Sequence, residues 1–96
     1  MIVWAPEAIL DIREAHDFIL ERNERAAERI TTAIYEAGER LSQFPNRGRR
    51  GRLSGTRELV VHGTPYILVY YVLESGAEIS RVMHHARNWP PDSNQP

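Results

Sequence analysis

The residues best suited to chemistry lie near the end of the chain, between positions 81 and 89. This segment contains Arg81, the adjacent pair His84 and His85, and then Arg87 and Trp89. A guanidinium group binds phosphate through two parallel hydrogen bonds, an imidazole exchanges a proton near neutral pH, and an indole ring stacks on a nucleobase. These residue types indicate phosphate or nucleic-acid chemistry at this end of the chain.

Arg57 extends the candidate set, because it falls on a predicted strand near the one that carries Arg81. The two guanidinium groups could then clamp one phosphate between them. A purely structural interpretation stays open beside the chemical one. In it, Arg81 pairs with a helix carboxylate, His84 is a hydrogen-bonded strand residue, and Trp89 seals the edge of the sheet.

The histidines do not form a predicted metal site. His84 and His85 are adjacent, and neighbouring residues of a strand point to opposite faces, so both cannot bind one ion. His16 and His62 have no ligand spacing, and the chain contains no cysteine. The sequence therefore indicates neither a metal nor another cofactor.

Residues 45–56 form a glycine-rich basic stretch, and we expect a mobile loop there. Its cations are Arg47, Arg49, Arg50 and Arg52. Nine acids and five arginines give residues 1–43 a net charge of −4, whereas four acids and seven arginines give residues 44–96 a net charge of +3. The loop suits nucleic-acid phosphates or an acidic protein segment, and a solvated loop without a partner is the alternative.

The hydrophobic spacing predicts an α+β domain. Apolar residues recur at helical intervals from Glu7 to Asn23 and again from Ala26 to Phe44, which predicts an antiparallel helical hairpin ended by Pro45. The remaining apolar segments have the length and alternation of strands. The strands are expected at residues 2–4, 57–61, 66–73 and 77–85. The order is β-α-α-β-β-β, with the hairpin packed on one face of a mainly antiparallel four-stranded sheet.

The length of 96 residues suits one core, so we expect a single domain over residues 1–91 and a disordered tail over 92–96. Charged side chains interrupt residues 1–20, which argues against a signal peptide. The longest apolar run, residues 66–73, is too short to cross a bilayer. We therefore expect a cytoplasmic protein that does not associate with a membrane.

Six segments in order resemble the RelE/ParE superfamily, the toxins of bacterial type II toxin–antitoxin modules. The opening W-A-P-E-A-x-x-D-I is similar to the first strand and helix of the family, and Arg57-Glu58-Leu59 after the basic loop is similar to its second strand. The strands at 65–70 and 79–84 carry the strongest resemblance. The closing H-x-A-R-x-W is similar to plasmid-stabilisation members.

The resemblance implies a toxin that stops growth and that a cognate antitoxin silences in a hetero-oligomer, with the antitoxin tail lying across the sheet and the groove beside the helical hairpin. It leaves two targets open: RelE-like members cleave messenger RNA on the ribosome, and ParE-like members poison DNA gyrase. Ribonucleolytic relatives commonly carry an arginine after the aromatic residue of the third strand, where this chain has Ile67. We therefore expect a ParE-like toxin in which Ile67 is buried.

If the chain is instead a RelE-like ribonuclease, the resemblance implies a catalytic set of Arg57, Arg81, His84 and Arg87, with His84 as the acid. The residues expected to bind the target or the antitoxin are Arg47, Arg49, Arg50, Arg52 and Trp89. A degenerate, non-toxic member that only binds the antitoxin is the third alternative.

Overall fold

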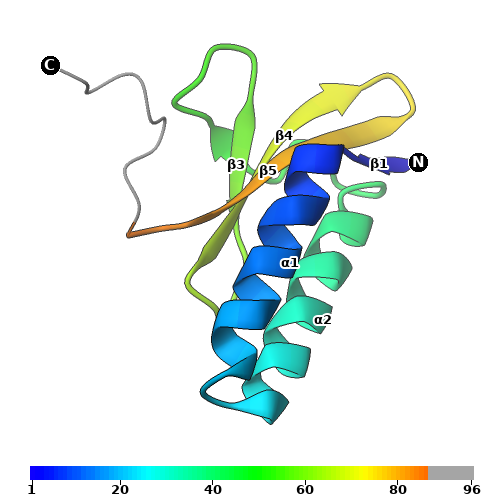
Figure 1. The fold of residues 1–96 in the computed structure, drawn as a ribbon. Coiled ribbons are helices and arrows are strands. Elements are labelled where there is room, and N and C mark those ends of the chain that lie inside the picture. Colours follow the sequence, from blue (N-terminus) through cyan, green and yellow to red (C-terminus); the bar gives the residue numbers. More distant parts are fainter. Residues whose placement is uncertain (87–96) are drawn as a thin grey trace, which may run out of the picture.

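The computed structural model describes residues 1–86 as two helices packed on one face of a five-stranded sheet (Figure 1). The helices are α1 (Pro6–Leu20) and α2 (Glu24–Arg40). The strands are β1 (Ile2–Trp4), β2 (Arg49–Arg50), β3 (Arg57–Val60), β4 (Tyr66–Leu73) and β5 (Gly76–His84). Their order across the sheet is β1-β5-β4-β3-β2, with β1 parallel to β5 and every other neighbour antiparallel. The predicted α+β class is confirmed.

Local signals fix where the helices begin. Pro6 lies in the first turn of α1, where the missing N–H has no intrahelical partner to lose. The side chain of Asn23 accepts a hydrogen bond of 3.1 Å from the Ala26 N–H and caps α2. The two helices lie side by side and antiparallel (Figure 1), as the sequence predicts.

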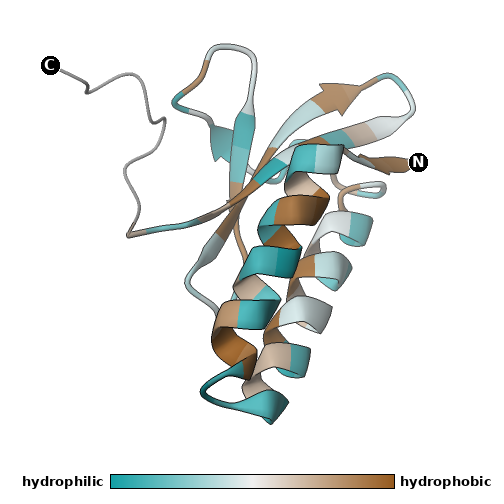
Figure 2. Ribbon diagram, in the orientation of Figure 1, coloured by the Kyte–Doolittle hydropathy of each residue, from teal (hydrophilic) through white to brown (hydrophobic). Residues whose placement is uncertain are grey.

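The main core lies between the helices and the sheet, and hydrophobic bands recur along α1 and α2 between hydrophilic ones (Figure 2). Its largest fully buried apolar side chains are Tyr70, Ile34, Leu41, Leu68 and Ile79. At one end of the core, Gly38 of α2 makes room for the Trp4 ring, since a Cβ there would lie 2.4 Å from the ring. The Trp4 indole then donates to Glu39 at 3.1 Å, which ties β1 to α2.

The sheet face away from the helices carries a smaller apolar cluster. Val69 of β4 and Met83 of β5 are buried there, and Leu53 packs against them. Ile67 lies two residues before Val69 on the same face of β4 and pairs with Val60 and Met83 on the neighbouring strands. It is 5% exposed, so its predicted burial is confirmed.

Two details of the predicted fold are wrong. The sheet has five strands rather than four, because β2 forms inside the predicted loop and pairs with β3. The second helix ends at Arg40 and does not reach Phe44, because hydrogen bonds between residues three apart turn the chain from Leu41 to Gln43. The predicted tail at 92–96 lies outside the described residues.

Candidate functional site

Arg81 is held by a carboxylate of α1. Its guanidinium donates to both oxygens of Asp11, from Nε at 2.7 Å and from Nη2 at 2.9 Å. The backbone N–H of Val82 donates to the same carboxylate at 2.9 Å. The hydrogen bond to Asp11 is the main cause that raises the pKa of Arg81. The structural interpretation of Arg81 is confirmed, and this side chain joins β5 to α1.

Arg57 binds backbone carbonyls in the connection between α2 and β2. Its Nη1 donates to the carbonyl oxygens of Gly48 at 2.7 Å and Asn46 at 3.3 Å. The strand β4 separates β3 from β5, and the two arginines reach different elements of the fold. The structure therefore does not bring Arg57 and Arg81 together on one phosphate.

His84 ends β5 and lines a cavity of about 410 Å³ between α1 and β5. Its imidazole packs edge-on against Tyr66 with 5.4 Å between ring centroids, and its Nδ1 accepts a hydrogen bond of 3.1 Å from the Ala86 N–H. We call this cavity the α1–β5 groove. The other residues that line it are acidic or largely apolar: Asp11, Glu14, Ala15, Phe18, Tyr66, Val82 and Ala86.

The outer edge of β5 beside this groove has no covering strand in the described part of the chain. β1 pairs with β5 only as far as Ile79. Beyond that point α1 packs against β5, and the Asp11 carboxylate accepts a hydrogen bond from the Val82 N–H. The groove therefore combines apolar lining residues with a strand edge whose backbone N–H and C=O groups are only partly hydrogen-bonded.

His84 and His85 stack on each other instead of pointing to opposite faces. Their ring centroids lie 5.2 Å apart and their planes meet at 26°. The prediction from strand alternation is wrong because β5 ends at His84 and His85 lies in the turn that follows. Within residues 1–86, no group of three His, Asp or Glu side chains is placed to hold a metal ion.

Glu58, which is 2% exposed, organises the basic loop. Its carboxylate accepts hydrogen bonds from the backbone N–H of Arg52 at 3.0 Å and from the guanidinium groups of Arg49 and Arg52, each at 3.1 Å. Burial by itself raises the pKa of Glu58, but hydrogen bonds from these two arginines and the charge of Arg52 outweigh it, so the pKa lies below its ordinary value. The loop that the sequence predicted to be mobile is therefore hydrogen-bonded to β3.

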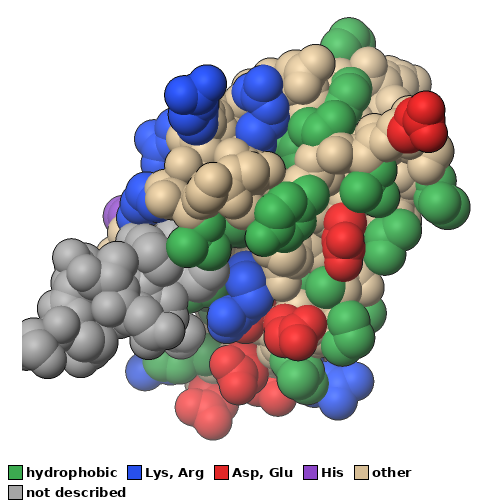
Figure 3. All heavy atoms as spheres, turned by 90° about the horizontal axis from the view of Figure 1, so that it is seen from above, with side chains coloured by type: hydrophobic (Ala, Val, Ile, Leu, Met, Phe, Trp, Pro, Cys, Tyr) green, Lys and Arg blue, Asp and Glu red, His purple; other side chains and the backbone are tan. Residues whose placement is uncertain are grey.

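The other two loop arginines do not contact Glu58. Arg47 and Arg50 are exposed, and neither has a side-chain partner within residues 1–86. Arg57 adds a third charge that no carboxylate of the described region balances. In Figure 3, several arginine side chains gather at the upper left, apart from most of the acidic side chains.

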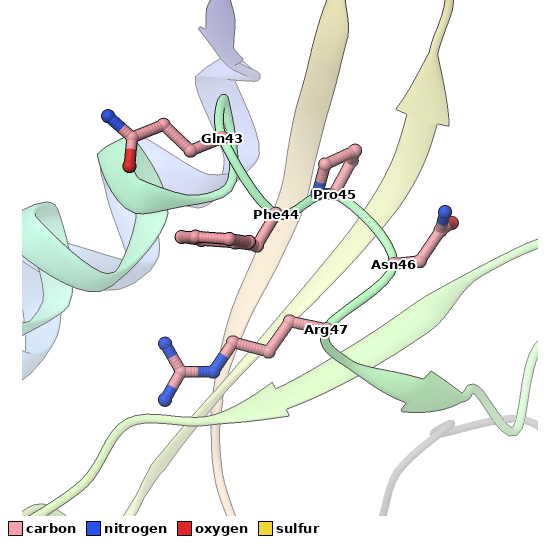
Figure 4. A pocket seen from close by; sticks show the side chains of 5 residues that line it. All are labelled: Gln43, Phe44, Pro45, Asn46 and Arg47. Carbon is pink, nitrogen blue, oxygen red and sulfur yellow. The ribbon is translucent and has the colours of Figure 1, made fainter.

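The connection from α2 to β2 presents an aromatic side chain that the sequence pattern assigned to a helix. Phe44 is 58% exposed, and residues 43–47 line an open cavity of about 610 Å³ (Figure 4). A proline disfavours the helical conformation in the residue before it, so Pro45 was a signal that Phe44 lies outside the helix. We call residues 43–48 the Phe44 turn.

Two predicted site residues, Arg87 and Trp89, lie outside the described residues. Of the predicted catalytic set, the structure therefore places Arg57, Arg81 and His84, and it gives each of them a different local environment. Arg49 and Arg52 bind Glu58, whereas the side chains of Arg47 and Arg50 are exposed and have no partner within residues 1–86.

A family profile described as the ParE toxin of the type II toxin–antitoxin system, parDE, matches residues 2–89. The chain belongs to the ParE toxin family. This ParE-family toxin is 36% identical over 89 residues to the protein Y4kP of Sinorhizobium fredii, which covers 93% of this chain and 92% of that protein. It is 35% identical over 86 residues to the toxin RelE2 of Caulobacter vibrioides, which covers 90% of this chain and 96% of that toxin.

The fold of the ParE-family toxin is also found in a solved structure, the chromosomal ParDE TA system from P. aeruginosa. The two chains superpose with a TM-score of 0.79 at 22% identity, over 86% of this chain and 92% of the other. This likeness confirms the arrangement of the helices and the sheet. Neither helix in the described part of the toxin is long and apolar enough to cross a membrane.

Proposed function

We propose that this ParE-family toxin stops growth by inhibiting DNA gyrase, without a catalytic step of its own. The observation that supports this most strongly is the separation of Arg57 from Arg81. RNA cleavage without a metal needs charge stabilisation and proton transfer at one phosphate. Here Asp11 holds Arg81 and loop carbonyls hold Arg57, while the buried Ile67 stands where ribonucleolytic relatives commonly have an arginine.

His84 supports a second candidate function, RelE-like cleavage of messenger RNA on the ribosome. Its Nδ1 accepts a hydrogen bond from the Ala86 N–H, so His84 must release this bond and take the imidazolium form before it can act as an acid. The α1–β5 groove places this imidazole beside Tyr66 and within a cavity that a nucleotide could enter. In this second candidate, His84 protonates the leaving 5′-oxygen.

A parallel assay of the two activities tests the proposal. Purified toxin is added to gyrase with relaxed plasmid and, separately, to ribosomes that carry a message. We expect supercoiling to stop and the message to stay intact, and we expect His84→Ala to inhibit gyrase as the wild type does. Message cleavage that falls roughly 100-fold in a folded His84→Ala variant establishes the ribonuclease instead. If expression of the wild-type toxin alone leaves growth unaffected, the chain is a non-toxic member.

We also propose that a cognate antitoxin neutralises the toxin in the cytoplasm, with its C-terminal segment in the α1–β5 groove and across the sheet. Phe18 and Val82 offer apolar contacts there, and the outer edge of β5 offers backbone groups for an added strand. Binding to the folded toxin alone stabilises it by mass action.

Phe18→Ala tests this placement of the antitoxin. Phe18 is 58% exposed, so its truncation removes a contact surface and lowers the stability of the fold only slightly. We expect calorimetry to show that the affinity for the product of the neighbouring gene falls about tenfold, as for other interface aromatics. Leu10→Ala is the control, because Leu10 is 54% exposed on the same helix but does not line the groove. Equal affinity of wild type and Phe18→Ala would show that the antitoxin binds elsewhere.

A further inference from the structure

We propose that the Phe44 turn is the surface through which this toxin docks on its protein target. It receives a segment that carries an apolar side chain flanked by carboxylates. The inference rests on the proposed function, because it takes the target to be a protein, DNA gyrase. It assigns docking to a part of the fold that is separate from the α1–β5 groove.

The Phe44 turn is held in place from beneath by buried groups. The hydroxyl of the fully buried Tyr70 donates to the Pro45 carbonyl at 2.7 Å and accepts from the Gly48 N–H at 2.9 Å. Gly48 is itself buried, and a Cβ there would lie 2.7 Å from the Tyr70 hydroxyl and 2.8 Å from the carbonyl oxygen of Glu58. The Arg57 guanidinium fixes two more carbonyls of the turn. A surface held in this way loses little conformational freedom when it binds a partner.

The turn presents an aromatic ring beside a cation. Figure 4 shows the Phe44 ring and the Arg47 guanidinium extending from the turn to the same side, while Pro45 and Asn46 point elsewhere. Phe44 is 58% exposed, and Arg47 has no side-chain partner within the described region. Aromatic residues and arginine are prominent among the side chains that dominate interface energies. The pair therefore suits an apolar side chain next to an acid.

The positive charge around the turn indicates that the partner segment is negatively charged. Residues 45–58 contain five arginines and one acid, Glu58, and so carry a net charge of +4. Glu58 binds Arg49 and Arg52, whereas Arg47 and Arg50 have no acidic partner among residues 1–86. Carboxylates on the incoming segment match this charge, which favours the encounter and fixes the orientation.

A short acidic protein segment fits this surface better than a nucleic-acid strand does. The positive charge is local, because residues 1–43 carry a net charge of −4 and place Glu36 and Glu39 in the last turns of α2. An extended polyanion that ran from the turn along α2 would meet these acids. The net charge of the whole chain is −1, which lacks the strongly basic balance of nucleic-acid-binding domains.

The Phe44 turn and the α1–β5 groove lie on different sides of the helical hairpin. α1 packs against β5, whereas α2 packs against β4 and leads through the turn into β2, the edge strand farthest from β1. A ligand in the groove therefore does not occupy the turn directly. Substitutions in the turn can then be tested for target binding and for antitoxin binding independently.

The test compares Phe44→Ala and Arg47→Glu with two controls of similar exposure, Leu10→Ala on α1 and Arg25→Glu at the start of α2. Each full-length toxin is purified and assayed for affinity to the intact gyrase holoenzyme, affinity to the antitoxin, thermal unfolding and growth arrest. We expect each turn variant to lose about tenfold in gyrase affinity, with a matching loss of growth arrest. We expect both turn variants to keep the wild-type antitoxin affinity and unfolding temperature. Both control variants should match the wild type in all four assays.

Three results overturn the inference: gyrase affinity retained by Phe44→Ala, antitoxin affinity lost in Phe44→Ala, or binding of a labelled single-stranded oligonucleotide that Phe44→Ala abolishes. If the wild-type toxin leaves gyrase active, the proposed gyrase function fails, and the docking inference is decided by growth arrest alone. Arrest by Phe44→Ala equal to that by Leu10→Ala then overturns it. Arrest that is lost only in the turn variants supports docking on another protein.

Discussion

The Asp11 carboxylate binds the Arg81 guanidinium through two hydrogen bonds, at 2.7 and 2.9 Å, and so fastens α1 to β5. The contact begins where the pairing of β1 with β5 ends, at Ile79. Beyond Ile79, hydrogen bonds to the Asp11 side chain therefore take the place of pairing with β1. The Asp11 side chain is 10% exposed, so loss of its partner leaves a poorly solvated charge.

Breaking this pair is expected to destabilise the fold. We expect Asp11→Ala and Arg81→Ala each to lower the free energy of unfolding by about 2 kcal/mol, as for hydrogen bonds to charged groups. Urea unfolding of both variants and of the double variant measures the effect and the coupling between the two residues. Arg25→Ala, an exposed arginine without a side-chain partner in residues 1–86, is the control. Additive losses in the double variant would show that the two side chains do not act as a pair.

The hydroxyl of Tyr70 supports the Phe44 turn, so its removal should loosen the turn. Tyr70→Phe leaves the Pro45 carbonyl and the buried Gly48 N–H without this partner, and we expect a loss of about 1–3 kcal/mol. Hydrogen exchange at the Gly48 amide should become faster. Tyr71→Phe is the matched control, because Tyr71 is the next residue of β4 and is exposed. Unchanged exchange at Gly48 would contradict the assigned role of the hydroxyl.

The lowered pKa of Glu58 makes stability depend on pH in a defined direction. A carboxyl group whose pKa is lower in the folded state binds its proton more readily when unfolded. Its stabilising contribution is complete above the ordinary pKa of glutamate and is lost as the pH falls through the lower folded-state value. Unfolding of wild type and Glu58→Gln, measured from neutral to acid pH, should show a shallower acid loss in the variant. Glu74→Gln, at an exposed acid, should keep the wild-type slope.

Ile67 should contribute packing rather than chemistry. Ile67→Ala removes a side chain that is 5% exposed, and we expect a loss of about 2–5 kcal/mol in unfolding free energy. Val60→Ala, at the cross-strand neighbour that is 58% exposed, should cost less than about 0.5 kcal/mol. Wild-type stability in Ile67→Ala would mean that this face of β4 is not packed as described.

The parts of the fold that follow from local patterning were predicted from the sequence. Helical spacing predicted α1 and most of α2, and apolar runs predicted β4 and β5 to within a residue. The burial of Ile67 followed from its place in a strand that is apolar on both faces. The 3.6-residue period identifies the helices, whereas β4 has no alternation and was predicted from its length and the turns that bound it.

The candidate site could not be predicted in the same way, because its geometry depends on partners far apart in the chain. Two roles stayed open for Arg81, a phosphate clamp with Arg57 or a pair with a helix carboxylate, and the sequence did not identify Asp11 as that carboxylate. The register shift between Val69 and Tyr70 was not predicted either. The strand β2 has two residues, too few to show a period, and it is fixed through the buried Glu58. Such contacts leave no pattern in the local sequence.

The pairing of β1 with β5 also limits when this toxin can fold during its synthesis. The amino group of Met1 donates to the Ser75 carbonyl at 2.6 Å, across 74 positions of the chain. β5 lies between β1 and β4 and supplies Ile79 and Val82 to the main core, yet among the strands of residues 1–86 it is translated last. Contacts this distant in sequence form late. A nascent chain that stalls before β5 therefore exposes its unpaired strands and helices to proteases and chaperones, and the folded protein forms only after the ribosome has passed this strand.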